Sequence, residues 1–278
     1  MSNSNAREKG MESSYKYYSQ FGEDYLLWEF FDRKSDGFYV DVGAFDGIHI
    51  SNTYSFQQKG WKGICIEPNP GIFRYCRENR SQSLCLNMAC IGSPHLKEVN
   101  FYVEDIGLLS TTINNKAKEN DIRERYHNRG LTFTGLKKIT VKAATLNDIL
   151  TEHFPGIKQI DFISIDTEGN ETEVLEGIDP NRFHIRVFVI EAHTREDEIK
   201  ISGLLNQKGS YRLARKLEEN LVFVKTEEDL EKMRQIEVNC TIEKQMHPLG
   251  VKYSLPRLLQ GKKIKSAALT VQEHKNRR

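Results

Sequence analysis

The sequence lacks the features that mark membrane-spanning, secreted and metal-cluster proteins. No apolar run approaches the length that a transmembrane helix needs, and the opening MSNSNAREKG has no apolar signal-peptide segment. The five cysteines are odd in number and form no CxxC pair, which indicates neither a disulfide framework nor a zinc cluster. We therefore expect a soluble, cytoplasmic protein in a reducing compartment, with no membrane span.

An excess of charge of one sign is also missing. Lys and Arg total 40 against 39 Asp and Glu, which leaves a net charge of +1. Such a balance argues against a chain that mainly coats nucleic acid or an anionic membrane, so nucleic acid is not an expected partner. Hydrophobic residues make up 38% of the 278 residues and charged residues 28%, which permits one large packed domain with an appendage.

Composition divides the chain into three parts. Residues 1–14 are rich in Ser and Asn and are expected to form a mobile N-terminal arm. Residues 15–225 form the main domain, within which the polar stretch 104–137 exceeds ordinary loop lengths and indicates a long lid, a mobile insertion or an unrecognised helix. Residues 226–278 begin acidic and end basic, which is typical of a charged, solvated C-terminal extension.

Strand and helix patterns alternate through the main domain. Short apolar runs such as GFYVDV, GICI, SLCLNMACI, DFISI and RVFVI predict buried strands, and the segments between them have helical spacing. Ser51 and Thr145 are candidate helix N-caps, and residues 211–225 predict an antiparallel hairpin at a sheet edge. This alternation predicts a doubly wound, mainly parallel sheet.

The most informative motif is Asp41-Val-Gly43-Ala-Phe-Asp-Gly47, which follows a predicted strand and precedes a predicted helix. Ligands of open α/β sheets bind at the carboxyl ends of strands, where glycines let the backbone approach them. An acid in place of the first glycine of GxGxxG would meet a pyrophosphate badly and suits a sulfonium ligand. The motif therefore favours S-adenosylmethionine (SAM) over NAD, the other interpretation being a tight turn that binds nothing.

Two further segments lie where a nucleoside would bind. Glu67 ends the second strand, twenty residues after Gly47, where a carboxylate can accept both ribose hydroxyl hydrogens. Residues 87–90 end the third predicted strand and could meet an adenine edge, although they could equally be part of the core.

Acidic residues follow the next two strands. Asp166 and Glu168 come directly after DFISI, and Glu191 and His193 come at the end of RVFVIEAH. Two carboxylates at a strand end can take a proton or hold substrate hydroxyls, and His193 is the histidine best placed to act near neutral pH. Glu168 could instead favour a helix start, and His193 could be structural. Asp166, Glu191 and His193 could also converge on a divalent cation, but their spacing is not diagnostic and no metal is predicted.

The blocks SQFGEDYLL, YVDVGAFDGIHISNT, GWKGICIEPNP and DFISIDTEGNETEVLEGI, in order over roughly residues 19–193, resemble the FkbM-type SAM-dependent methyltransferases. The resemblance implies an α/β, Rossmann-like class I methyltransferase fold, with a seven-stranded mainly parallel sheet, an antiparallel last strand and helices on both faces. It also implies O-methylation of a hydroxyl, commonly on a sugar, a glycan or a polyketide-like product.

The resemblance assigns roles to individual residues. The catalytic candidates facing the methyl group and the acceptor are Asp166 and Glu168, to which our own reasoning adds His193. The residues expected to surround SAM are Gln20, Asp41, Gly43, Ala44, Gly47, Ser51, Asn52, Thr53, Glu67, Pro68, Asn87, Met88, Ala89, Cys90 and Asp166.

Three alternatives remain open at this point. The protein could be an RNA methyltransferase that binds RNA phosphates through the basic tail and residues 116–138. The near-zero net charge of the chain argues against this alternative. The same sheet could belong to a nicotinamide-dependent oxidoreductase. The missing first glycine of the GxGxxG motif argues against this alternative. A non-catalytic module could retain the SAM pocket and act through partners.

Overall fold

The computed structural model describes residues 15–250 and 263–266 and is built on a seven-stranded sheet in the order β3-β2-β1-β7-β8-β10-β9. Six strands are parallel to one another, and β10 runs antiparallel to both β8 and β9. The strands are β1 (Phe38–Val42), β2 (Lys62–Ile66), β3 (Leu84–Leu86), β7 (Gln159–Ile165), β8 (His184–Glu191), β9 (Arg212–Leu217) and β10 (Asn220–Val224). The predicted sheet, with its antiparallel last strand and edge hairpin, is confirmed.

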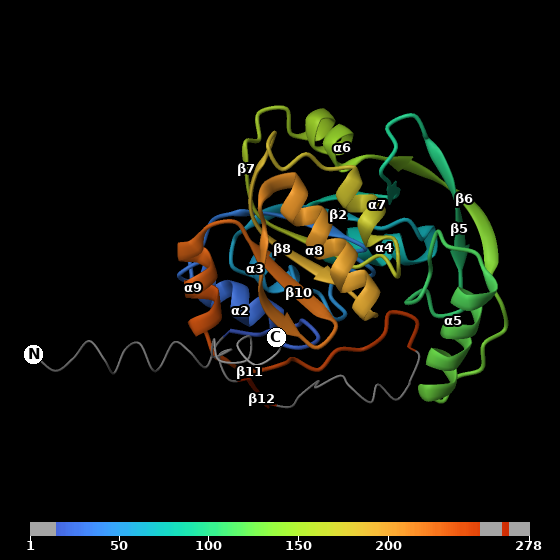
Figure 1. Cartoon of the computed structure of the whole chain (residues 1–278). Helices are drawn as coiled ribbons and strands as arrows, with labels where there is room; N and C mark the ends of the chain where they lie inside the picture. Colours follow the sequence, from blue (N-terminus) through green and yellow to red (C-terminus); the bar gives the residue numbers. More distant parts are fainter. Residues whose placement is uncertain (1–14, 251–262, 267–278) are drawn as a thin grey trace, which may run out of the picture.

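Helices cover both faces of this sheet (Figure 1). On one face lie α2 (Glu23–Phe30), α3 (Tyr54–Gln58), α4 (Pro70–Asn79) and α9 (Glu227–Gln235). The other face carries α6 (Leu146–His153), α7 (Glu171–Glu176) and α8 (Arg195–Gly209). Side chains alternate along each strand, so that in β1 Tyr39 joins the first core and Val40 the second.

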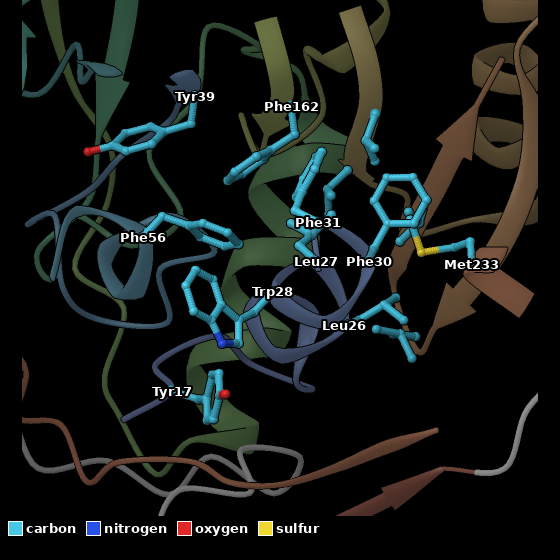
Figure 2. Close-up of a cluster of buried hydrophobic side chains, with 14 of the residues drawn as sticks. Tyr17, Leu26, Leu27, Trp28, Phe30, Phe31, Tyr39, Phe56, Phe162 and Met233 are labelled. Atoms are coloured by element: carbon cyan, nitrogen blue, oxygen red, sulfur yellow. The ribbon is translucent and has the colours of Figure 1, made fainter. Parts of the chain in front are cut away.

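The first core is dense in aromatic rings, which Figure 2 shows grouped around α2. Phe56 of α3 lies between Trp61, at a ring-centroid distance of 4.7 Å, and Phe162 of β7, at 4.8 Å. Phe31 directly after α2 also contacts Trp61, at 5.2 Å. Aromatic contacts of this kind add to the stabilisation from burial, so α2 and α3 are firmly fixed to the sheet beneath the strand ends.

Two local predictions can be compared with the backbone. Thr145 caps α6 as predicted, because its Oγ1 accepts a hydrogen bond of 3.1 Å from the backbone N–H of Asp148. Ser51 was a candidate N-cap of the helix after β1, but the N-cap is Thr53 and α3 begins at Tyr54. The hydroxyl of Ser51 instead accepts from the backbone N–H of Tyr54, at 3.1 Å.

The predicted third strand is split between two sheets. Its first half is β3, and its second half, β4 (Ala89–Cys90), belongs to a small sheet with β5 (Glu98–Val103) and β6 (Lys137–Ala144). Asn87 lies at the break, where its side-chain amide donates to the carbonyls of Glu67, at 2.8 Å, and Pro68, at 3.0 Å. These two bonds hold Asn87 against the segment that follows β2.

Residues 104–137 contain the helix α5 (Lys116–Asn128), which stands beside the small sheet (Figure 1). Ile122 and Tyr126 of α5 pack against Ile106, Leu109 and Phe133 in a separate small core. The unrecognised-helix interpretation of this stretch is thus the one that the structure supports for 116–128.

The expectation of a solvated extension after residue 225 is wrong for the part that the structure describes. Helix α9 packs against α2 and β9, and β11 (Val238–Thr241) contacts α2 and pairs with β12 (Lys263–Ser266). Leu230 and Met233 are the buried apolar residues that attach α9. The predicted arm at 1–14 lies outside the described residues, as do 251–262 and 267–278. Within the described ranges, no helix combines the length and apolar character needed to cross a membrane.

Candidate active site

A pocket with an empty volume of about 880 Å³, including its open mouth, lies at the carboxyl ends of β1, β2 and β7. This is where an open α/β sheet places its ligands. Twelve of the residues predicted from the sequence line it: Asp41, Gly43, Ala44, Ser51, Asn52, Glu67, Pro68, Met88, Ala89, Cys90, Asp166 and Glu168. The other predicted residues lie outside the wall: Gln20, Gly47, Thr53, Asn87 and His193.

Gly43 lies where the turn after β1 passes closest to β7. Its backbone N–H donates to the carbonyl of Ile66 at 2.9 Å, and its φ is +83°. A Cβ at this position would stand 1.6 Å from the carbonyl oxygen of Asp166. Only glycine fits here, because the space that a side chain would need is taken by the carbonyl of Asp166 directly after β7.

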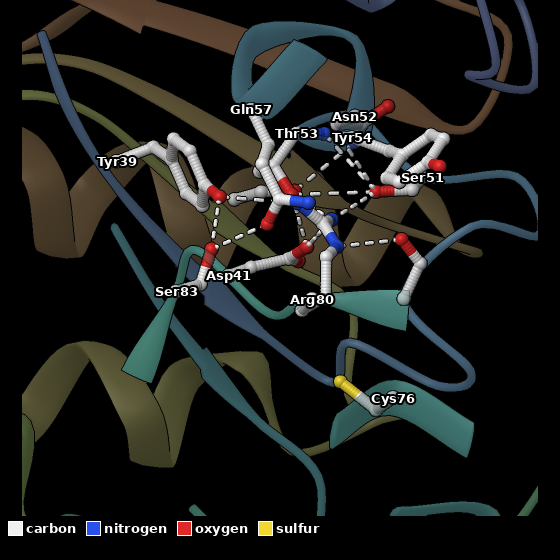
Figure 3. A network of polar contacts seen from close by, with 12 residues as sticks. Tyr39, Asp41, Ser51, Asn52, Thr53, Tyr54, Gln57, Cys76, Arg80 and Ser83 are labelled. Atoms are coloured by element: carbon white, nitrogen blue, oxygen red, sulfur yellow. Dashed lines mark hydrogen bonds and ion pairs between the residues drawn. The ribbon is translucent and has the colours of Figure 1, made fainter. Parts of the chain in front are cut away.

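Asp41 is held by a buried arginine that the sequence analysis did not identify. The Arg80 guanidinium lies 3.1 Å from Oδ2 of Asp41, and it also donates to the hydroxyl of Ser51, at 2.8 Å, and to the carbonyl of Gly47, at 2.6 Å (Figure 3). Thr53 donates to the same Oδ2. Burial raises the pKa of Asp41 to about 6, and the nearby Arg80 opposes that shift.

The expected role of Asp41 changes accordingly. Its Oδ2 is taken by a cation and a hydroxyl of the protein itself, so the charge of Asp41 stabilises the turn around Gly47 rather than standing free for a sulfonium. Gly47, Ser51 and Thr53 belong to the same network. Ser51 also lines the pocket, whereas Gly47 and Thr53 lie outside its wall. No pattern in the sequence marks Arg80, the C-cap residue of α4, as part of this network.

Glu67 is buried at the end of β2, with both carboxylate oxygens turned toward backbone donors. Oε2 accepts from the N–H of Phe45 at 2.9 Å, and Oε1 from the N–H of Asn69 at 2.7 Å. Burial raises the pKa of Glu67 to about 8, with Asp41 and Asp46 adding to the shift. Each carboxylate oxygen retains a further lone pair for a ligand hydroxyl.

The remaining wall is more apolar and comes partly from segments that the sequence analysis did not assign to the site. Met88, Ala89 and Cys90 line it as predicted, joined by Phe101 of β5 and Leu108 of the following loop. These side chains give a surface suited to a flat aromatic ring.

The rim beside Phe45, His49 and Ile50 is covered by the segment after β11. Gln245 accepts from the backbone N–H of Ile50 and donates to the carbonyl of Tyr18, the latter at 2.6 Å. The ring of His247 packs on Phe45, at a centroid distance of 5.5 Å, and on His49, at 5.9 Å. Phe45, His49 and Ile50 line the pocket, so residues 245–247 brace its wall.

Acidic residues gather at the ends of β7 and β8. Burial and the neighbouring Glu191 and Glu168 raise the pKa of Asp166 well above its ordinary value. A carboxyl with a raised pKa is suited to taking a proton near neutral pH. Asp166 lines the pocket, so this group faces whatever binds there.

Glu168 is ionised and held by cations from α5. Arg125 donates to its two oxygens at 2.5 and 3.0 Å, and Lys118 lies 3.5 Å from Oε2. Burial opposes ionisation, but Arg125, His193 and Lys118 outweigh it and lower the pKa of Glu168 well below its usual range. Glu168 also has a φ of +57°, an uncommon conformation for a residue other than glycine.

His193 lies outside the pocket wall, between two carboxylates. Its Nε2 is 3.1 Å from Oε2 of Glu191 and 3.5 Å from Oε2 of Glu168. Burial alone would lower the pKa of His193, but the two acids raise it to about 11. His193 is therefore protonated near neutral pH in this arrangement, which favours Asp166 over His193 as the group that accepts a proton.

Three of the five free cysteines meet behind the pocket, which their spacing in the sequence did not indicate. The Sγ atoms of Cys65, Cys76 and Cys85 all lie within 4.8 Å of one another. They come from β2, α4 and β3, so the thiols converge only once the helix packs on the sheet.

The sheet order, with antiparallel β10 between β8 and β9, and the pocket at the strand ends define a Rossmann-like class I methyltransferase fold. The model of the methyltransferase FkbM domain matches residues 41–241. The chain therefore belongs to the FkbM methyltransferase family.

Individual relatives were also found. Methyltransferase sdnD of Sordaria araneosa is 29% identical over 196 residues, which cover 63% of this chain and 74% of that protein. Precorrin-6y C5,15-methyltransferase of Geobacter metallireducens is similar in structure, with a TM-score of 0.39 and 13% identity over 73% of this chain and 88% of that one. Aeropyrum pernix fibrillarin, solved with natively bound SAM, has a TM-score of 0.34 and 8% identity over 68% and 65% of the two chains.

Proposed function

We propose that this methyltransferase uses SAM to methylate a hydroxyl group, with a sugar, a glycan or a glycosylated natural product as the acceptor. The observation that carries the proposal is one pocket lined by the Gly43 turn, by the buried carboxyl of Glu67 and by Asp166, whose pKa is raised. SAM, when bound, supplies an electrophilic methyl group on a sulfonium leaving group.

The residues of the pocket fit such a cofactor. Glu67 can accept hydrogen bonds from both ribose hydroxyls while its existing backbone donors keep the carboxylate in place. Gly43 lines the pocket, where its backbone can contact the ligand. Met88, Cys90 and Phe101 offer the apolar wall for an adenine.

The acceptor is assigned to the side of the pocket where Asp166 and Glu168 lie. Asp166 takes the proton of the acceptor hydroxyl, and Glu168, fixed by Arg125 and Lys118, orients the acceptor by accepting a second hydroxyl hydrogen. Alignment of the two reactants is the main task, and orientation of this kind can lower a barrier by roughly 7–11 kcal/mol. A positioned base adds roughly 10²–10⁴-fold.

Calorimetric titration with S-adenosylhomocysteine, and separately with NADH, tests the cofactor. We expect binding of S-adenosylhomocysteine alone, weakened in Glu67→Ala and unchanged in Glu78→Ala, which alters an exposed acid on α4. Binding of NADH alone would reject the methyltransferase site.

The acceptor class is tested by transfer of a labelled methyl group to a panel of hydroxylated sugars, glycans and RNA. Labelled sugar or glycan supports the proposal, and salt-sensitive labelling of RNA alone overturns the acceptor class. Cofactor binding without transfer to any member of the panel would favour the non-catalytic module.

A further inference from the structure

Three side chains at the ends of β7 and β8 converge on a single point beside the pocket. Glu191 is the last residue of β8, His193 follows two residues later, and Glu168 lies three residues after β7. One atom from each residue, a carboxylate oxygen or an imidazole nitrogen, lies within 4.8 Å of both others. Nε2 of His193 lies 3.1 Å from Oε2 of Glu191 and 3.5 Å from Oε2 of Glu168.

The contact between His193 and Glu191 does not have the geometry of a hydrogen bond. Oε2 of Glu191 is buried and has no hydrogen-bond partner of acceptable geometry among the described residues, although Nε2 approaches it to 3.1 Å. Donor atoms that share a cation at about 2.0–2.2 Å stand roughly 3–3.5 Å apart. The observed separations fall within this range, so the three side chains can share a cation with little movement.

The charges around these side chains point the same way. Four carboxylates gather here, those of Asp166, Glu168, Glu171 and Glu191. The permanent cations among their described neighbours are Arg125 and Lys118. The acidic side chains therefore outnumber the permanent cations around this point.

Arg125 competes for part of this site. Its Nη1 lies 2.5 Å from Oε2 of Glu168, the same oxygen that faces His193, while its Nη2 binds Oε1 at 3.0 Å. A cation can replace the first contact and leave the second in place. Removing the guanidinium should therefore strengthen binding of the cation, which a purely structural ion-pair network would not predict.

We propose that Glu168, Glu191 and His193 form a binding site for a divalent cation that accepts mixed oxygen and nitrogen ligands, such as Mn²⁺. Carboxylate and imidazole are the ligand types that such ions take in proteins. The metal site does not depend on the proposed function. A role of the ion in catalysis does rest on the proposed methyl transfer.

In that role the ion binds the oxygen of the acceptor hydroxyl and lowers the pKa of that hydroxyl. The hydroxyl proton passes to Asp166, and the oxygen forms its bond to the methyl carbon as the carbon–sulfur bond breaks. The electron pair of the broken bond stays on sulfur, which leaves as the neutral thioether.

The test is equilibrium dialysis of the full-length protein against Mn²⁺, with bound metal counted by mass spectrometry. Mn²⁺ is chosen because the thiols of Cys65, Cys76 and Cys85 prefer softer ions. We expect one Mn²⁺ per chain, with affinity reduced at least tenfold in Glu191→Gln and His193→Ala. The matched changes Glu152→Gln and His153→Ala, on exposed positions of α6, should have no effect.

Loss of Mn²⁺ binding in Glu191→Gln or His193→Ala could also result from misfolding. Arg125→Gln avoids this ambiguity, because it should bind Mn²⁺ several-fold more tightly than the unaltered protein. Lack of binding at millimolar Mn²⁺ in both the unaltered protein and Arg125→Gln would overturn the proposal. Binding that is equally strong in Glu191→Gln would also overturn it.

The dialysis contains neither cofactor nor acceptor, so its result is separate from the methyl-transfer assay. A protein that binds Mn²⁺ but not S-adenosylhomocysteine would refute the proposed function and retain the metal site. Methyl transfer that continues unchanged after removal of bound Mn²⁺ by a chelator would refute the catalytic role of the ion.

Discussion

The affinity of the chain for S-adenosylhomocysteine should depend on pH through Glu67. Burial raises the pKa of this group from an ordinary 4.5 to about 8, so below pH 8 the ligand-free protein holds it mainly as the neutral acid. The ribose hydroxyls donate to the ionised form, so binding at lower pH requires loss of a proton. Affinity should therefore rise with pH and level off above about pH 8.

The size of the effect follows from the same pKa. One pH unit below the pKa costs about 1.4 kcal/mol, so affinity at pH 7 should be roughly tenfold, and at pH 6 roughly 100-fold, below the plateau. Glu67→Gln should abolish the slope, because the amide does not titrate. The amide also turns a donor toward one of the two backbone N–H groups of Phe45 and Asn69, which costs about 1–3 kcal/mol of folding stability.

Isothermal titration calorimetry between pH 6 and 9 measures both quantities. Titration of the ligand itself affects the native protein and Glu67→Gln equally, so the difference between the two slopes isolates Glu67. Parallel curves for the two proteins would refute the assignment of Glu67 as the ribose acceptor. The folding free energy gives a second readout: the native protein should lose stability relative to Glu67→Gln as the pH rises from 4.5 to about 8.

Three further predictions concern the frame of the site. Arg80→Met should cost about 3–5 kcal/mol in urea denaturation, because it leaves Asp41 buried without its cation; a loss below about 1 kcal/mol would contradict the buried pair. Gly43→Ala should abolish S-adenosylhomocysteine binding by calorimetry, because the added Cβ would overlap a backbone oxygen; unchanged affinity would show that the turn is not part of the pocket. Arg125→Gln should lower kcat roughly 10–100-fold, because it frees the carboxylate of Glu168. Arg123→Gln alters an exposed ion pair on the same helix and should retain kcat. Equal kcat values for the two variants would show that Arg125 does not contribute to the site.

The features that follow short-range sequence patterns were predictable. Short apolar runs located the strands of the main sheet, and the residue types at the ends of β1, β2 and β7 marked the edge where the pocket lies. Thr145 was recognisable as a cap because the cap bond spans only three residues. Such patterns depend on local backbone geometry, which the sequence specifies directly.

The features that depend on packing between distant elements were not predictable. Arg80 pairs with Asp41 across 39 positions, and no local spacing connects a helix C-cap with a strand. Asn87, at the break between β3 and β4, bonds to two carbonyls of the segment after β2, about twenty positions earlier in the chain. The sequence suggested His193 as a base. The charge of His193 is set by Glu168 and Glu191, and only the fold shows that these two acids lie beside it.

The contacts of residues 242–247 bear on the order in which the molecule matures during synthesis. Ile242 forms a parallel bridge with Tyr17, Gln245 joins Tyr18 to Ile50, and His247 packs on Phe45. On the ribosome, the sheet strands through β10 emerge before this segment does. The wall of the pocket at Phe45 and Ile50 thus acquires its brace only late in translation, so the nascent chain can form its sheet well before it can hold a cofactor firmly.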